Sequence, residues 1–150
     1  MKIISFNECN NKDYWMEQIL KSDWDARLFL DRAYKEKEIR ALFGKHLDIL
    51  LLVENDQLIS YCTYAEFDEI QPTELTPWVG FVYTFPEYRG NRYMGLIFEE
   101  ISKLAQSDNY SYIYLSTNHT SVYEKYGFEF YQILNDIQGN PSRIYRKKIK

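Results

Sequence analysis

The order of apolar and polar residues predicts a chain of short strands and amphipathic helices. Apolar residues that recur every three or four positions are typical of one helical face, whereas a short continuous apolar run is typical of a buried strand. Residues 93–106 give the clearest helix, because their apolar side chains form one stripe and the charged ones lie off it. The longest apolar run, Ile49–Val53, predicts a strand that is buried on both faces.

Along the whole chain these patterns follow one another in the order of a mixed α/β sheet. Strands are predicted over residues 2–6, 49–53, 58–67, 78–85, 111–115, 128–134 and 143–149. Helices are predicted over residues 11–20, 24–43, 93–106 and 120–126. Asp23 is expected to cap the second helix, and Gly44 and Gly127 are expected to end the helices before them. No linker rich in Pro, Gly or Ser interrupts this order, so we expect one domain over residues 1–150.

Composition and charge narrow the class of protein. Apolar residues make up 45% of the chain and aromatic residues 17%, which excludes intrinsic disorder. The net charge of -4 argues against nucleic acid as a general partner, and no apolar run approaches the roughly 20 residues of a membrane span. The two cysteines show no metal-ligand spacing and the N-terminus turns polar early. We therefore expect no metal site, no signal peptide and a cytoplasmic location.

The segment from Trp78 to Gly95 carries the strongest chemical signal. A predicted strand runs into a turn rich in Gly and Arg, and an amphipathic helix follows at once. The first turn of a helix has unpaired N–H groups and a positive dipole end, so it can accept a phosphate. Arg89 and Arg92 flank this turn and can add charge-assisted hydrogen bonds. The pattern indicates a ligand with a diphosphate; an ordinary strand–turn–helix with two solvated arginines is the alternative.

Two motifs resemble those of a known family. The run Phe85-Pro86-Glu87-Tyr88-Arg89-Gly90 resembles the acyl-CoA loop of the GNAT N-acetyltransferase superfamily, and Val122-Tyr123-Glu124-Lys125-Tyr126-Gly127-Phe128 resembles a second segment of that family. The loop departs from the family pattern at Arg92, where glycine is usual, and at Met94, where glycine or alanine is usual. Both residues can adopt helical dihedral angles, so we expect the helix geometry to survive and the loop amides to stay available.

The resemblance implies an α/β (α+β) fold with a mixed, mostly antiparallel central sheet flanked by helices. It implies an acetyl-CoA-dependent N-acetyltransferase, in which a primary amine of a small molecule or peptide attacks directly and forms a tetrahedral intermediate. A homodimer is a further family-level expectation. The residues that it assigns to the diphosphate are Arg89, Gly90, Asn91, Arg92, Tyr93, Met94 and Gly95. Asn118 resembles the residue that binds the pantetheine arm, although it is equally typical of a helix N-cap.

The transfer reaction makes two demands that other residues can meet. By the same resemblance, backbone N–H groups of Val82, Tyr83 and Thr84 bind the thioester oxygen, with Gly80 marking a bulge in that strand. Tyr123 aligns with a tyrosine that donates a proton or hydrogen bond to the departing thiolate. The alternative for Tyr123 is a core tyrosine.

The acceptor amine has to lose its proton before it attacks, which calls for a carboxylate or a histidine. Glu66, at the end of a predicted strand, is the first candidate for this base. Less favoured candidates are Asp68, Glu69, Glu74 and His119. The acidic loop that begins at Glu66 can also attract a cationic substrate, or can simply be a solvated charged loop. A non-catalytic acyl-CoA-binding or regulatory module on the same fold is the alternative to the enzyme.

Overall fold

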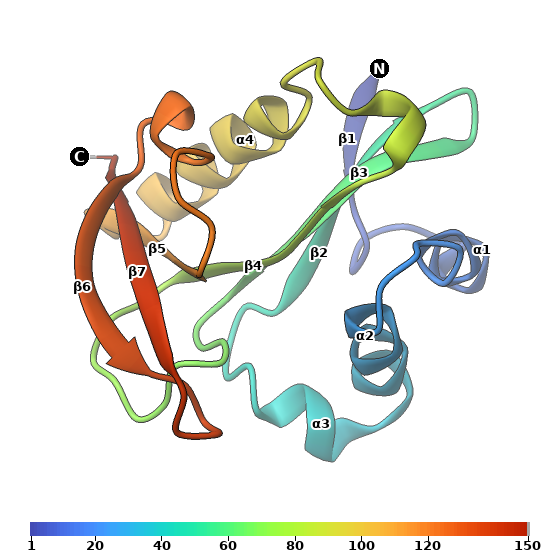
Figure 1. Cartoon of the computed structure of the whole chain (residues 1–150). Helices are drawn as coiled ribbons and strands as arrows, with labels where there is room; N and C mark the ends of the chain where they lie inside the picture. Colours follow the sequence, from blue (N-terminus) through green and yellow to red (C-terminus); the bar gives the residue numbers. More distant parts are fainter. Residues whose placement is uncertain (150) are drawn as a thin grey trace.

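One mixed β-sheet with helices on both faces organises residues 1–149, the part of the chain that the computed structural model describes (Figure 1). The strands are β1 (Lys2–Ser5), β2 (Asp48–Glu54), β3 (Gln57–Ala65), β4 (Trp78–Thr84), β5 (Tyr112–Thr117), β6 (Glu129–Asn135) and β7 (Pro141–Lys148). The helices are α1 (Lys12–Ile19), α2 (Ala26–Lys35), α3 (Lys37–Ala41) and α4 (Met94–Ser107), with 3-10 turns η1 (Pro86–Tyr88) and η2 (Glu124–Tyr126). None of the helices in residues 1–149 has the length and apolarity that crossing a bilayer requires.

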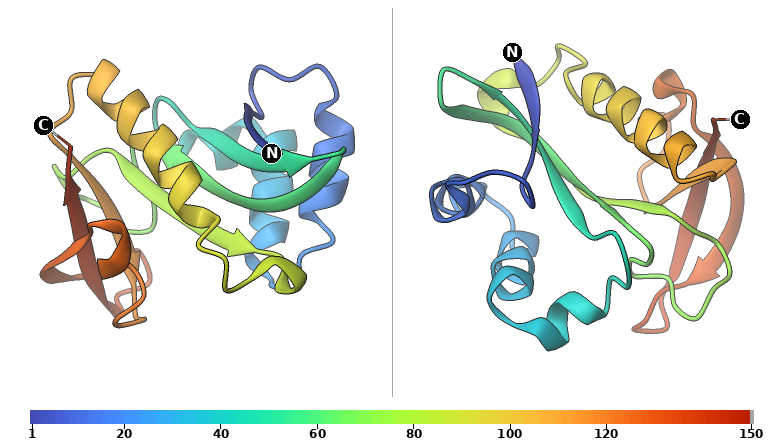
Figure 2. Two further views of the ribbon diagram at one scale, coloured as in Figure 1. Left: turned by 90° about the horizontal axis from the view of Figure 1, so that it is seen from above. Right: turned by 180° about the vertical axis from the view of Figure 1, so that it is seen from behind.

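The strand order explains how the sheet is divided into two wings. Within the described residues the seven strands lie in the order β1-β2-β3-β4-β5-β7-β6. Neighbouring strands are antiparallel except for β4 and β5, which are parallel and lie at the centre. Figure 2 shows β1 to β4 on one side of α4 and β5 to β7 on the other. The predicted mixed, mostly antiparallel sheet flanked by helices is confirmed.

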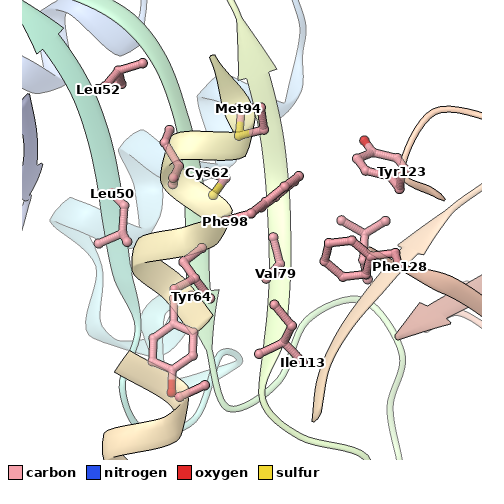
Figure 3. Packing of buried hydrophobic residues seen from close by; sticks show 14 of the residues in the cluster. Leu50, Leu52, Cys62, Tyr64, Val79, Met94, Phe98, Ile113, Tyr123 and Phe128 are labelled. Carbon is pink, nitrogen blue, oxygen red and sulfur yellow. The ribbon is translucent and has the colours of Figure 1, made fainter. Parts of the chain in front are cut away.

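Both faces of the central strands are buried. In β2, Leu50 and Leu52 point toward α4, whereas Ile49, Leu51 and Val53 belong to the cluster on the face of α1 and α2. Because successive strand residues point to opposite faces, a continuous apolar run is what a doubly covered strand requires. Figure 3 shows the α4 side of this packing, where Met94 and Phe98 lie over the sheet. The prediction for β2 is confirmed.

The prediction of a single second helix over residues 24–43 is wrong. The chain forms α2 and α3 with an extended residue between them, Glu36, at φ -122° and ψ 120°. Packing does not hold the two in line, because α3 has no buried residue whereas α2 buries Leu30 and Ala33. Asp23 does not cap either helix. Instead its carboxylate accepts a hydrogen bond from Tyr83, a contact across the sheet face that local sequence does not encode.

The predicted helix over residues 120–126 is also wrong, because only the 3-10 turn η2 forms there. Ser121 has φ 62°, and a residue in the left-handed region cannot continue a right-handed helix. Gly127, at φ 94°, ends η2 as predicted. The turn leaves Tyr123 at its N-terminal boundary, facing the centre of the protein rather than solvent.

The start of α4 corrects the expectation for Arg92. The helix begins at Met94, one residue later than predicted, and Met94 is helical as expected, but Arg92 has φ 57° and lies in the left-handed region. The chain has to turn sharply between the end of η1 and the first turn of α4, and Gly90 with φ 86° provides the other half of this turn. A residue with a Cβ atom is strained at such a dihedral, which explains why a glycine is usual at this position of the loop.

The strain at Arg92 predicts a difference between two variants that both lack the guanidinium. Arg92→Gly should be more stable than Arg92→Ala by about 1 kcal/mol, because only glycine adopts this dihedral without a steric cost. The free energy of unfolding in urea, with the denaturant slope compared between variants, measures the difference. An alanine variant as stable as the glycine variant would show that residue 92 is not held in the left-handed region.

Candidate active site

The two central strands, β4 and β5, separate from each other, and a cavity lies between their separated parts. β4 and β5 pair only at Trp78 with Tyr114 and at Val79 with Leu115. Beyond these pairs β5 stays bound to β7, while β4 continues beside β3 (Figure 1). The opening holds a cavity of about 440 Å³ that residues of both strands and of α2 line. A cavity at a break in the sheet, with unpaired backbone groups around it, is a natural place for a ligand.

A bulge in β4 shapes one wall of this cavity. The pairing of β4 with β3 shifts by one residue between Gly80 and Tyr83, so Phe81 and Val82 together oppose one residue of β3. The bulge predicted at Gly80 is therefore present beside it. Phe81 has φ 49° and packs on the side of α2 and α3, whereas Val82 packs on the side of α4. The extra residue thus turns a large aromatic ring toward the helices.

Phe81 is the centre of an aromatic wall. Its ring lies 6.4 Å from Trp24, 6.1 Å from Phe29 and 5.9 Å from Phe43, measured between centroids. All four side chains line the cavity. Local sequence does not predict this wall, because its members meet only through the bulge and the α2–α3 connection. Aromatic residues are four of the 20 at positions 24–43, close to the 17% of the whole chain, so their frequency gives no signal.

Asp68 lies deep in the cavity against Gly80. A Cβ atom on residue 80 would collide with the Asp68 carboxyl group, so the glycine is required by this close approach. The Oδ1 atom of Asp68 is buried and has no hydrogen-bond partner within residues 1–149. Burial raises the pKa of Asp68 to about 7, although a hydrogen bond from the backbone of Glu69 acts in the opposite direction. A carboxyl group in this state is typical of a functional site.

Glu66, the first candidate for the base, lies outside the cavity lining. The backbone N–H of Lys45 donates to its Oε1 atom at 2.7 Å, and its side chain packs against Gly44, whose φ is 69°. Its backbone oxygen accepts a hydrogen bond from Thr76. These contacts hold the segment before β2 against the end of β3. The catalytic role of Glu66 stays a prediction.

Tyr123 lines the cavity opposite the aromatic wall. Its ring packs near Phe98 and Phe128, both at 6.2 Å between centroids, and its side chain is 9% exposed (Figure 3). Burial raises the pKa of Tyr123 to about 12. No residue of the described chain hydrogen-bonds to its hydroxyl group, which is therefore left for a ligand.

Two other predicted residues near Tyr123 lie at the surface. His119 lines the mouth of the cavity and is exposed. Asn118 is exposed and lies outside the cavity lining, and it does not cap a helix, because η2 begins later at Glu124. The structure thus brings His119 and Tyr123 together at the cavity and leaves Asn118 at its edge.

The side chains of Tyr83 and Thr84 are engaged away from the cavity. The Tyr83 ring stacks on Tyr61 at 5.5 Å, and its hydroxyl group donates to Asp23. The Thr84 hydroxyl lies 2.8 Å from that of Ser60. Only the backbone groups of these two residues are left for the predicted contact with a thioester. Val82 differs, because its side chain lines the cavity.

The turn before α4 forms a second, smaller cavity of about 180 Å³. Within residues 1–149, the N–H groups of residues 90–94 find no acceptor in the protein. Arg92 and Lys125 line this cavity, so its charge is positive. Arg89 is used differently: its Nε atom donates to the Thr84 oxygen at 2.8 Å, and its guanidinium lies over the Tyr83 ring. Free N–H groups beside two cations fit a diphosphate.

The remaining candidates are spread around these two cavities. Glu69 lines the larger cavity, but its carboxylate accepts a hydrogen bond from Ser116 at 2.7 Å. Glu74 lies outside it. Gly95, in the first turn of α4, lets the ring of Tyr126 approach, since a Cβ atom there would come within 3.2 Å of it. In the described part of the chain no three His, Cys, Asp or Glu side chains meet as metal ligands.

Several solved structures are similar to the whole chain. An aminoglycoside 6'-N-acetyltransferase complexed with coenzyme A is 16% identical, with 100% of this chain and 98% of the other covered at a TM-score of 0.68. The aminoglycoside 6'-N-acetyltransferase from Enterococcus faecium is 16% identical, with the same coverage and a TM-score of 0.67. An acetyltransferase from Streptococcus agalactiae 2603 is 22% identical, covering 98% and 97% at a TM-score of 0.65. At these identities the likeness shows the fold.

The sequence itself gives the family. A search of curated proteins returned no match. The family model for the acetyltransferase (GNAT) domain, in contrast, matches residues 16–131, which include the separated strands, the turn before α4 and Tyr123. The chain therefore belongs to the GNAT acetyltransferase family and is an acyltransferase.

Proposed function

We propose that this enzyme transfers the acetyl group of acetyl-CoA to a primary amine that binds beside Asp68. The observation that carries the proposal is the cavity between β4 and β5, which has an unpaired buried carboxylate on one wall and a free phenol on another. The amine belongs to a small molecule or a peptide. A cytoplasmic location, a homodimeric state and the absence of a metal ion stay predictions.

The turn before α4 is the proposed site of the coenzyme A diphosphate. The N–H groups of residues 90–94 have no acceptor in the described chain, and four of these five residues line a cavity that Arg92 and Lys125 make positive. Thr84 lines this cavity and Val82 lines the larger one, and two residues of a strand span roughly 7 Å. β4 therefore connects the two cavities, and its backbone can follow the pantetheine arm between them.

The backbone of β4 is also proposed to bind the thioester oxygen. The bulge at Phe81 and Val82 interrupts the pairing with β3, and β5 has already separated on the other side. Tyr83 and Thr84 pair again with β3, and backbone N–H groups alternate between the two edges of a strand, so those of residues 82–84 that face the β5 side are available to an oxygen in the cavity. One such donor supplies about 3–4 kcal/mol in the transition state of acyl transfer.

Asp68 is proposed to accept the proton of the amine. An amine with a pKa of about 10.4 is neutral in only about 1 of 2,500 molecules at pH 7. A buried carboxylate binds the ammonium form, and burial then favours transfer of the proton, since the neutral pair is better tolerated there. The pKa of Asp68, about 7, suits this exchange at neutral pH. Glu66 is already bound to Lys45 and does not reach the cavity.

Tyr123 is proposed to assist the departing thiolate. Its hydroxyl group is free, and with a pKa of about 12 it stays protonated throughout the neutral range. It can therefore donate a hydrogen bond to the sulfur as the carbon–sulfur bond breaks. The ammonium loses one proton to Asp68 before it attacks, and its nitrogen loses a second proton as the tetrahedral intermediate collapses. That second proton balances the one that the thiolate of coenzyme A takes from Tyr123 or from water.

Ligand binding tests the proposal directly. Acetyl-CoA and coenzyme A should each raise the melting temperature, by roughly 5–10 °C at 100 times their Kd. ATP carries the same adenine and a longer phosphate chain but no pantetheine, so it should stabilise much less. Release of the free thiol with a panel of amines then measures turnover. Stabilisation by ATP but not by coenzyme A would exclude the proposal, and binding without turnover would indicate a non-catalytic module.

The role of Tyr123 predicts a change in kcat alone. Tyr123→Phe should lower kcat about 10- to 100-fold and leave the affinity for acetyl-CoA nearly intact, because only a hydrogen bond to the leaving group is lost. Tyr110→Phe is the matched control, since Tyr110 packs against the same core cluster but lines neither cavity. Turnover that is equal in the two variants would remove Tyr123 from the mechanism.

The role of Asp68 predicts a pH effect. Asp68→Asn should lower kcat/KM at least 100-fold at pH 8, and the ratio of wild-type to variant kcat/KM should rise with pH up to about 7 and then level. The ratio removes the titration of the amine and of Glu69, His119 and Tyr123, which both proteins share. Glu66→Gln is the decisive comparison. If the rise of kcat/KM with pH were lost in Glu66→Gln rather than in Asp68→Asn, the base would be Glu66 and not Asp68.

A further inference from the structure

The cavity has one wall that is almost wholly apolar. This wall lies on the α2 and α3 side of the cavity and comprises Trp24, Ala26, Phe29, Leu42, Phe43 and Phe81. Ile137, from the connection between β6 and β7, lines the cavity as well. The aromatic members pack on one another, so their surface is preformed rather than assembled by a ligand. Such a wall recognises hydrocarbon and offers little to hydroxyl or ammonium groups.

The same cavity provides one free carboxylate. The Oδ1 atom of Asp68 is buried and unpaired among the residues that the structure describes. Glu69 also lines the cavity, but its carboxylate accepts a hydrogen bond from Ser116, and its backbone oxygen accepts one from Ile137 at 2.8 Å. Glu69 thus ties the loop after β3 to β5 and to the β6–β7 connection. An ammonium group beside Asp68 is thus paired inside the cavity, whereas a second one lying against the apolar wall would find no carboxylate within that wall.

We infer that the acceptor is a small monoamine with an apolar body, such as an arylalkylamine or alkylamine, whose amine meets Asp68 and whose hydrocarbon part lies on the wall of Phe29, Phe43 and Phe81. The inference rests on the proposed function and names its substrate class. A volume of about 440 Å³ suits one small molecule and is at the lower end for ligand sites. A polycationic amino sugar would leave further ammonium groups unpaired against aromatic rings.

The inference separates this enzyme from the aminoglycoside acetyltransferases of similar fold. An aminoglycoside carries several ammonium and hydroxyl groups, and each needs a partner when water is removed. Seven polar residues of the described chain line this cavity, but none belongs to the apolar wall, Glu69 and Ser116 are already bonded to each other, and Gln71 donates to backbone oxygens. A shared fold therefore does not imply a shared acceptor, because the wall that contacts the acceptor depends on the α2–α3 segment and on the bulge of β4.

A matched pair of amines tests the inference with the wild-type enzyme. Hexylamine and 1,6-diaminohexane have the same length and differ by one ammonium group, and phenethylamine and kanamycin extend the comparison. Thiol release from acetyl-CoA should give a kcat/KM at least tenfold higher for hexylamine than for 1,6-diaminohexane. Phenethylamine should exceed kanamycin at least 100-fold.

A charge placed on the apolar wall should change this preference. Leu42 lines the cavity and is 47% exposed, so Leu42→Glu adds a carboxylate without removing a core side chain. The ratio of kcat/KM for the diamine to that for hexylamine should rise at least tenfold. Leu28→Glu is the control, because Leu28 is 49% exposed, belongs to α2 and lies outside the cavity lining. In Leu28→Glu the ratio of kcat/KM for the diamine to that for hexylamine should equal the wild-type ratio.

The outcomes distinguish this inference from the proposed function. Turnover of kanamycin or of the diamine as fast as of hexylamine would overturn the monoamine class and keep the acetyltransferase reaction. A ratio that is the same in Leu42→Glu and Leu28→Glu would overturn the assignment of the wall. Absence of thiol release with every amine, although acetyl-CoA binds, would overturn both.

Discussion

The separation of β4 from β5 is the constraint on which the rest of the site depends. Two parallel strands that stop pairing expose backbone N–H and C=O groups inside the protein, and these groups need partners. The bulge at Phe81 and Val82 loosens the other edge of β4 as well. A strand that has lost its neighbour on one edge and is loosened by a bulge on the other can bind an extended ligand along its backbone, which an intact sheet cannot do. The α4 turn, the aromatic wall and Tyr123 acquire a function only because they surround this opening.

The two sides of the opening have opposite charge, although the whole chain carries only -4. The turn before α4 combines free N–H groups with Arg92 and Lys125, whereas the larger cavity contains Asp68 and is lined by no lysine or arginine of the described residues. This difference in charge supports the proposal that an anionic cofactor and a cationic acceptor bind on different sides of one strand. The Asp68 carboxyl lies close to low-dielectric walls, so its effect is stronger than that of the exposed Arg92 and Lys125.

Local sequence predicts those parts of the structure that local rules determine. The doubly buried β2, the stripe of α4 and the turn at Gly90 follow from periodicity and from the steric freedom of glycine. The break at Glu36 and the choice of base do not follow. Glu66 and Asp68 would share one face if β3 continued through them, but β3 ends at Ala65. Which carboxylate becomes buried is then decided by contacts with the distant Lys45 and Gly80.

The contrast among the three carboxylates of this segment is itself an argument for function. Glu66 and Glu69 have hydrogen-bond partners that explain their positions, whereas the buried oxygen of Asp68 has none in the described chain. A carboxyl pKa raised by burial means that the stability present at low pH is lost as the pH rises from about 4 through about 7. Near neutral pH the Asp68 carboxyl group is therefore partly charged, and this buried charge destabilises the fold. A residue with a purely structural role would not need such a charge. An ammonium ligand would remove this cost and turn the destabilisation of the free enzyme into affinity for the ligand, which supports the proposed role of Asp68.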